Sequence, residues 1–251
     1  MRKRDKILNL ILPVITIGCI LIFWSISAKI VGSEYILPNL TDTFRALVSL
    51  FLDKKFYVAF SLTLLRSFIA FAVSFCIALV LAFVAYKYKK AERVVLTIMS
   101  VLRALPTVAI VLLLLFWTNS QVAPVVVTML VVTPTTYTHL KSAFSLIDKS
   151  VIEAGMVDGA NKKQALLKIE FPQIAPAVYS AIGSGISLNF KLMVAAEVLS
   201  ATVKSLGNML NDAKFNYDIA SMLAMVMAVV VFGIIVEAVF NKISKRSGEW
   251  Q

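Results

Sequence analysis

The 251-residue chain is poor in the residues that build catalytic and metal sites, with one histidine, two cysteines and nine glycines. None of the glycines precedes a lysine, which excludes the GxxxxGK[ST] loop that cradles phosphates. His139 alone offers neither a metal cluster nor an evident base for a nucleophilic triad, and Cys19 and Cys76 lie inside hydrophobic runs as packing residues. Glu153 and Asp158 stand on a loop with no evident pocket, which argues against a paired-carboxylate hydrolase. We therefore expect no enzyme, no catalytic residue, no metal and no cofactor bound by this chain.

Hydrophobic residues, by contrast, are abundant. They make up 59% of the chain, and the mean hydropathy is +0.86, whereas soluble domains normally hold about 45–50% apolar residues. One bilayer crossing needs roughly 20 apolar residues. The sequence therefore predicts an all-α integral membrane protein, with residues 1–251 as one transmembrane domain. Six stretches qualify as spans: about 8–31, 58–86, 94–117, 121–140, 173–199 and 217–240.

The formal charge of +11 is explained by where the basic residues lie. Most of the 25 lysines and arginines fall in the segments that are cytoplasmic if the N-terminus is inside. The outer segments hold only Arg45, Lys54, Lys55, Lys204 and Lys214. The positive-inside rule then predicts that both termini and the segment 142–172 are cytoplasmic. Because these charges flank membrane spans, they need no nucleic acid to explain them.

Residues 153–172, which read EAGMVDGANKKQALLKIEFP, form a polar segment between two hydrophobic runs. Gly159 can adopt the backbone angles that end a short helix. Asn161 followed by Gln164 predicts a capping box that opens a second helix, and Pro172 is expected to end it. Apolar residues at helical spacing would give each helix a small face for another protein: Val157 and Ala160, then Leu166 and Ile169. An amphipathic loop without a partner is the alternative.

Four charged residues fall inside the predicted spans: Arg66, Arg103, Lys191 and Glu197. A charge near the bilayer centre costs about 2.5–3.5 kcal/mol on insertion scales, so such residues mark partners or an aqueous path. We consider two hypotheses. The basic residues line a translocation path that favours anionic or strongly polar cargo, or the charges pair between helices and Lys191 snorkels.

Small and amphipathic patterns predict how the helices pack. Ala70, Ser74, Ala78 and Ala82 recur every four residues, as do Ala177, Ala181 and Gly185, and such stripes let membrane helices approach closely. Between residues 32 and 56, apolar residues predict a short amphipathic helix outside the bilayer core, which lies in the lipid interface or docks a partner: Phe44, Leu47, Val48 and Phe51.

The 153–172 segment resembles the cytoplasmic coupling loop of permease subunits in binding-protein-dependent ABC importers. The resemblance rests on Glu153, Ala154, Asp158, Gly159, Ala160, Ile169 and Pro172. Further segments are similar to the nitrate, sulfonate and taurine type of permease: 63–66, 103–109, 195–197 and 205–207. Ala70, Gly155 and Ser205 depart from that pattern. The departures affect the subfamily and the cargo more than the fold.

This resemblance implies a type I importer permease in the cell membrane, pairing with a second permease copy. Two cytoplasmic subunits would bind ATP and Mg²⁺ and receive the coupling loops, with Gly159 as hinge, while an extracytoplasmic binding protein delivers a small polar or anionic solute. Nitrate, sulfonates, taurine and vitamin precursors all fit. Two alternatives stay open: a scaffold subunit, and an ion-gradient-driven transporter that uses Glu197, Asp218 and Glu237.

Overall fold

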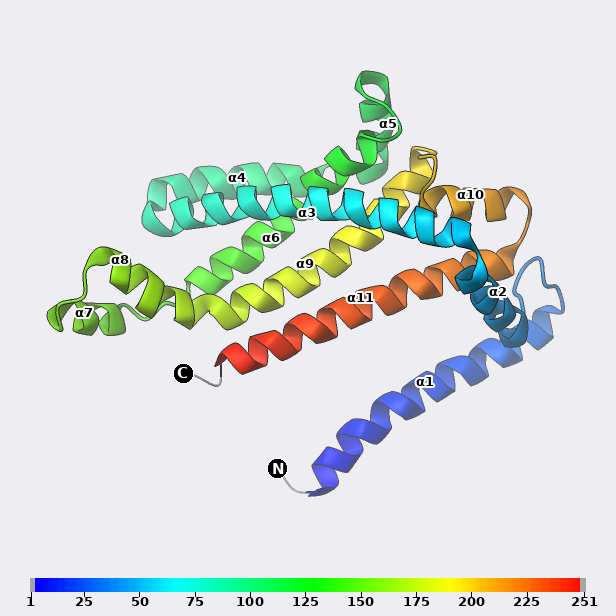
Figure 1. Ribbon diagram of the computed structural model, residues 1–251, viewed down its shortest axis with the longest axis horizontal. Coiled ribbons are helices and arrows are strands. Elements are labelled where there is room, and N and C mark those ends of the chain that lie inside the picture. The colour runs from blue at the N-terminus through cyan, green and yellow to red at the C-terminus, as the bar shows by residue number, and fades with distance from the viewer. Residues whose placement is uncertain (1–2, 249–251) are drawn as a thin grey trace. The chain divides into compact units, whose positions relative to one another are not determined.

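The computed structural model describes residues 3–248. Within the first helix it describes the side chain of Leu12 and the side chains from Ile15 onward. Within residues 3–248 the chain is helical and contains no strand (Figure 1). The expected all-α fold is thus confirmed. The elements are α1 (Lys3–Val31), α2 (Leu40–Leu52), α3 (Lys54–Lys87), α4 (Lys89–Ala104), α5 (Thr107–Trp117), α6 (Ala123–Phe144), α7 (Lys149–Val157), α8 (Lys162–Ala165), the π-helix η1 (Leu166–Glu170), α9 (Phe171–Leu199), α10 (Leu206–Phe215) and α11 (Ile219–Gly248).

The chain divides into two compact units. The first comprises residues 1–57 and 209–228, and the second residues 58–208 and 229–251. Helices α3, α10 and α11 each run from one unit into the other. The single transmembrane domain stays a prediction. Arg2, and the side chains of Lys3, Arg4 and Lys6, which contribute to the predicted orientation, lie outside the part of the chain described.

In the first unit, α2 is the expected amphipathic helix. Asn39 precedes it in extended conformation, and the indole Nε1 of Trp24 donates to the carbonyl of Pro38, 3.1 Å away. Thr43 is buried on the inner side, whereas Phe44 and Val48 are about half exposed. An apolar face left open in this way fits a helix lying in the membrane interface.

The second unit is built around α3, α6 and α9. Every member of the predicted stripe on α3 is fully buried: Ala70, Ser74, Ala78 and Ala82. On α9, a Cβ atom added to Gly185 would lie 2.6 Å from the ring of Phe71. Both stripes therefore bring helices into close contact, as predicted.

Among the described residues, three helices are long and apolar enough to cross a membrane: α3, the continuous helix from Lys162 to Leu199, and α11. The expected third span is broken, because α4 and α5 meet at 90° around Leu105 and Pro106, where a kink is predicted. Helix α6 covers the expected fourth span but is rich in threonine, and α1 offers a shorter apolar segment, Ile15–Val31. The count of six spans stays a prediction.

Several threonines on α6 donate back to carbonyls of the same helix, whereas the buried hydroxyl of Thr136 has no hydrogen-bond partner among the described residues. Thr128 and Thr133 donate to the carbonyls of Pro124 and Met129, at 2.6 and 2.7 Å. Such back-bonding satisfies these two hydroxyl donors in an apolar environment.

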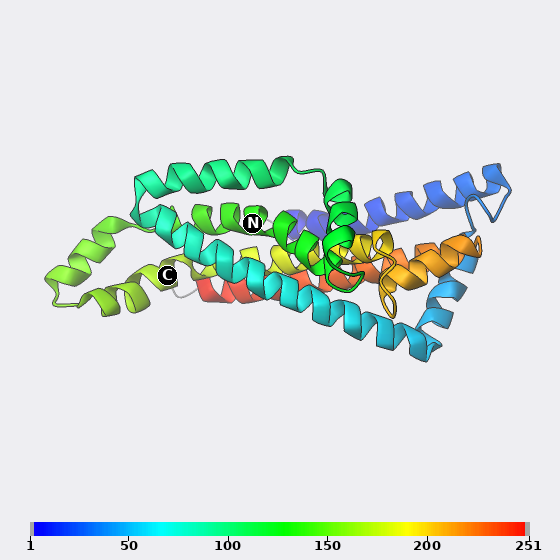
Figure 2. The same cartoon turned by 90° about the horizontal axis from the view of Figure 1, so that it is seen from above.

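Helix α9 connects two regions at opposite ends of the second unit. Figures 1 and 2 both show α7 and α8 at one end, and α5 with the segment that follows α9 at the other. The first region holds the segment 153–172, and Glu197 lies near the second.

Candidate functional site: a coupling loop and a buried ion pair

The first short helix of the loop, α7, begins at an aspartate cap. The Asp148 carboxylate accepts hydrogen bonds from the hydroxyl of Ser150 at 2.7 Å and from its backbone N–H at 2.8 Å. These bonds, the hydroxyl's first, lower the pKa of Asp148 below its usual value. The backbone N–H of Asp148 donates to the side-chain oxygen of Gln173, 2.7 Å away, and so ties the start of α7 to α9.

Gly159 ends α7 as predicted. Its φ is +91°, in the region that glycine adopts without strain. The N–H of Ala160 donates to the carbonyl of Gly155 at 3.0 Å, and the N–H of Gly159 to that of Met156 at 3.1 Å. These two bonds form a Schellman motif, which satisfies carbonyls at the end of a helix.

The predicted capping box opens the second helix. The side chain of Asn161 accepts from the N–H of Gln164, and that of Gln164 from the N–H of Asn161, both at 2.9 Å. From Lys162 the chain stays helical to Leu199 through α8, η1 and α9. The first residue of α9, Phe171, donates to Leu166, five residues back.

The expectation that Pro172 ends this helix is wrong. Proline lacks the N–H of the α-helical ladder and clashes with the carbonyl four residues before it. Here the ladder has already widened to π-type bonding over Leu166–Glu170, and Pro172 occupies the first turn of α9, where proline is tolerated. Residues 162–199 therefore form one helix with a π turn.

Helices α7 and η1, which form the two arms of the loop, pack closely at Gly155. A Cβ atom there would lie 2.3 Å from the Cδ1 of Ile169, so glycine lets Ile169 lie against α7. Ile169 thus faces inward, which corrects the expectation that it offers an outward apolar surface. Ile152 packs against the core formed by α3, α6 and α9.

The opposite side of the loop is open. Val157 is 87% exposed and Met156 about half exposed, and Glu153, Ala154 and Asp158 are exposed as well. Apolar side chains beside carboxylates on a hydrogen-bonded turn form a surface that a groove on another protein can accept.

At the other end of α9, Glu197 is fully buried and paired. Its Oε1 lies 3.0 Å from the Nη1 of Arg66 on α3, whose side chain is 14% exposed. Arg66 also donates to the Oε1 of Gln121. Two of the four predicted intramembrane charges thus come together, as the pairing hypothesis expects.

The second carboxylate oxygen of Glu197 holds the segment that follows α9. It accepts from the Thr63 hydroxyl at 2.8 Å and from the Gly207 N–H at 3.4 Å, and the Leu206 N–H donates to the Thr63 oxygen at 3.0 Å. A Cβ atom at Gly207 would lie 2.5 Å from the backbone carbon of Glu197. Within this segment Ala201 has a φ of +49°, a conformation that costs non-glycine residues energy.

The other two charges are placed separately. Arg103 of α4 donates to the carbonyl of Pro134, 3.1 Å away, and to the Thr138 hydroxyl, both on α6. Lys191 of α9 is exposed, and its stem passes close to Gly233 of α11. Asp218 caps α11 by accepting from the N–H of Ser221 at 2.9 Å.

Sequence reasoning missed two polar partners. Gln121 joins the Arg66 cluster, and the buried side-chain amide of Asn189 donates to the carbonyl and hydroxyl of Ser67 at 2.7 and 2.6 Å. An amide inside a hydrophobic run is a signal that could have found Asn189, since it needs a partner there.

Comparison with known proteins identifies related chains. The family model described as binding-protein-dependent transport system inner membrane component matches residues 74–248. The formylaminopyrimidine transport permease protein ThiX of Halalkalibacterium halodurans is 22% identical over 244 residues, which cover 95% of each chain.

Two solved structures share the fold. A chain of the inward-facing MetNI methionine ABC transporter matches with a TM-score of 0.64 at 18% identity, covering 74% of this chain and 93% of that one. A chain of a bacterial alginate ABC transporter, solved in complex with alginate pentasaccharide-bound periplasmic protein, matches with a TM-score of 0.59 at 19% identity and covers 97% and 96%.

Proposed function

The chain belongs to the family of binding-protein-dependent transport system inner membrane components, and from this we propose that it imports a small polar solute of the vitamin-precursor class. It is a membrane-embedded ABC importer permease for a small molecule, and like its family it carries no ATPase site of its own. The observation that carries the proposed cargo class is the match to the formylaminopyrimidine permease along 95% of both chains.

We assign ATPase coupling to the open side of the loop. Val157 is exposed on α7, as are Glu153 and Asp158, while the Schellman turn and the capping box hold the fold of the segment. Because α8 continues through η1 into α9, a push on the loop would be carried along one helix towards Glu197. ATP-driven closure of the partner subunits would thereby bias the permease between inward-facing and outward-facing states.

The proposed assembly has two copies of this permease, two cytoplasmic ATP-binding subunits and one extracytoplasmic binding protein, with both permease termini in the cytoplasm of the cell. The family description and the alginate transporter, solved with its periplasmic protein, support the ATPase and binding-protein partners. The homodimer follows from the sequence resemblance.

The charges of the second unit favour a polar cargo over an obligate anion. The carboxylate of Glu197 neutralises the charge of Arg66. Arg66 therefore contributes less positive potential to a translocation path than an unpaired arginine would. Lys191 and Arg103 stay candidates for that path. A nitrate- or sulfonate-type anion is the second cargo class, supported by the segments that resemble such permeases.

The experiment that tests the importer assignment is a mild-detergent pull-down of this chain from its native membrane. We expect an ATPase subunit to co-purify, and to be lost when residues 153–161 are scrambled. Vesicles holding the recovered complex should then take up solute when ATP is present. Uptake that ignores ATP depletion and collapses with ionophores would overturn the assignment.

The co-purified binding protein tests the cargo class. Its thermal unfolding should shift upward with a formylaminopyrimidine and stay unchanged with nitrate or taurine, because only a ligand bound to the native state stabilises it. A shift with nitrate or taurine instead would overturn the vitamin-precursor proposal and leave the importer role intact.

A further inference from the structure

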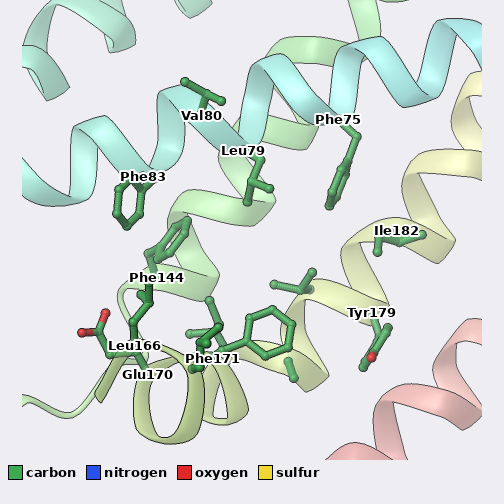
Figure 3. Close-up of a pocket in the computed structure, with 14 residues that line it drawn as sticks. Phe75, Leu79, Val80, Phe83, Phe144, Leu166, Glu170, Phe171, Tyr179 and Ile182 are labelled. Carbon is green, nitrogen blue, oxygen red and sulfur yellow. The ribbon is translucent and has the colours of Figure 1, made fainter. Parts of the chain in front are cut away.

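An apolar groove runs along α3 and α9 where both helices approach their charged ends. Its volume is about 560 Å³, within the range of about 300–1,000 Å³ usual for small-molecule sites. Figure 3 shows Phe83 of α3 facing Phe144 of α6, with Phe171 and Tyr179 of α9 along the other wall. Apart from the carboxylate of Glu170 and the hydroxyl of Tyr179, the lining side chains are hydrocarbon.

A basic recess adjoins this groove. It has a volume of about 430 Å³ and contains three lysines, Lys87, Lys162 and Lys163, against the single carboxylate of Glu170. Leu166 and Glu170 line both cavities, so the two lie next to each other. The Lys87 ammonium lies 4.7 Å from the centre of the Phe83 ring, which places a positive charge at the mouth of the apolar groove.

We propose that the groove and the recess together bind one anionic phospholipid. An acyl chain would lie in the groove, and the phosphate would lie against Lys87, Lys162 and Lys163. Helix α3 and the helix from Lys162 to Leu199 are both candidate membrane spans, and Lys87 is the last residue of α3, so the recess lies next to an end of that span. Basic pockets between membrane helices are sites where anionic headgroups bind.

Charge complementarity selects this occupant over a neutral lipid. In a bilayer, an acyl chain is surrounded by hydrocarbon whether it lies in the groove or among other lipids, so its burial in the groove adds little binding free energy. The headgroup therefore decides which lipid is retained. Each basic residue near an anionic surface contributes about 1 kcal/mol, which corresponds to roughly a fivefold change in occupancy. Three lysines opposed by one carboxylate therefore favour an anionic lipid clearly.

The site borders the loop to which ATPase coupling is assigned. Ile152 and Met156 of α7 line the recess together with Lys162 of α8. A phosphate held there would bridge the end of α3 and the start of the helix that contains α9. The site needs no partner protein, so its failure and that of the importer assignment are separate outcomes.

The test uses the full chain in nanodiscs containing equal amounts of phosphatidylglycerol and phosphatidylcholine, followed by native mass spectrometry of the released protein. We expect one phosphatidylglycerol per chain to be retained in preference to phosphatidylcholine. The double replacement Lys87→Gln and Lys162→Gln should lower that retention about tenfold or more. Lys168→Gln is the matched control, because Lys168 lies on the same helix and lines neither cavity, and it should change nothing.

The groove is tested separately with Leu79→Trp, which fills it from α3 without removing a charge. Loss of the retained lipid in this variant, with an unchanged elution profile, would support the acyl-chain position. Equal retention of both lipids, or an unchanged lipid count in the double lysine variant, would overturn the proposal. A Leu79→Cys chain lacking Cys19 and Cys76 that forms disulfide-linked dimers would overturn it too, because a second copy would then cover the groove.

Discussion

The two ends of the helix from Lys162 to Leu199 are built on opposite principles. At the loop end, apart from the bond between Asp148 and Gln173, the bonds that shape α7 and α8 join residues at most five apart, such as Ala160 to Gly155. At the far end, the bonds of Glu197 reach Thr63 and Arg66, more than 130 residues away. The loop is exposed, whereas Glu197 is fully buried.

One helix thus has the buried Arg66–Glu197 pair, which we call the anchor, at one end and an exposed loop at the other. A buried ion pair in a low-dielectric setting is costly to break, and Glu197 also secures the segment that follows α9. The loop holds its local shape through caps, which are individually weak, and leaves its apolar side chains open. We expect substitutions at the anchor to unfold the second unit and substitutions at the loop to affect coupling.

The largest effect is expected for Glu197→Gln, which tests whether the buried ion pair stabilises the second unit. It leaves the Arg66 charge buried without its counter-charge, and breaking such a pair usually costs about 3–5 kcal/mol. Thermal unfolding of the purified protein should show a large drop in Tm. Replacing Arg66 and Glu197 together with methionine should recover most of the loss, since apolar substitutes for a buried pair are often neutral. A single Gln variant as stable as the parent would contradict the anchor role.

Gly207→Ala comes next. The new Cβ would meet the backbone of Glu197 at 2.5 Å, where no flexible side chain can move aside, so we expect a loss of about 1–3 kcal/mol from overpacking. Gly18→Ala is the control, because no atom lies within 4 Å of its built Cβ. If both alanine variants unfolded at the same temperature, the close approach at Gly207 would not contribute to the stability of the protein.

Gly159→Val sharpens the comparison at the other end. Valine at a φ of +91° is strained by about 1–3 kcal/mol, and the strain is confined to a loop that Gly159 terminates. The protein should insert and purify normally while ATP hydrolysis no longer drives uptake in vesicles. Gly159→Asn, which tolerates positive φ better, should retain more coupling. Full uptake by the valine variant would remove the coupling role from this turn.

The smallest effect is expected for Asn161→Ala, which removes half of the capping box and costs about 0.5–2 kcal/mol in helix stability. Faster hydrogen exchange of the amides from Lys162 to Ala165 would report it, with Tm of the whole protein nearly unchanged. Combined with Gln164→Ala, the two losses should be less than additive, because each residue already needs the other. Strict additivity would mean that the two hydrogen bonds form independently.

The loop was predictable from the sequence to the extent that its structure is local. Gly159, Asn161 and Gln164 act on neighbours a few residues away, so their roles follow from spacing alone. The π turn escaped prediction, since nothing in LLKIE marks a widened turn, and with it Pro172 was misread as a helix end.

The anchor was predictable only in part. The four charges were identifiable because they interrupt apolar runs, yet nothing in the sequence says that Arg66 meets Glu197 and that Lys191 does not. Such pairing depends on how α3 and α9 pack, which Ala70, Gly185 and Phe71 set through contacts distant in sequence. The small-residue stripes predicted the contact between helices but not its register.

The π turn at Leu166–Glu170 also fixes the phase between the coupling loop and the span. A π turn holds one residue more than the α-helical turn it replaces, and one residue corresponds to about 100° of rotation around a helix. Deleting a single residue between 166 and 170 would convert the segment to plain α-helix and swing Val157 and Glu153 through that angle, with every membrane-facing residue of α9 left in place. The orientation of the loop thus depends on a single count of residues and can change by insertion or deletion without any rebuilding of the core.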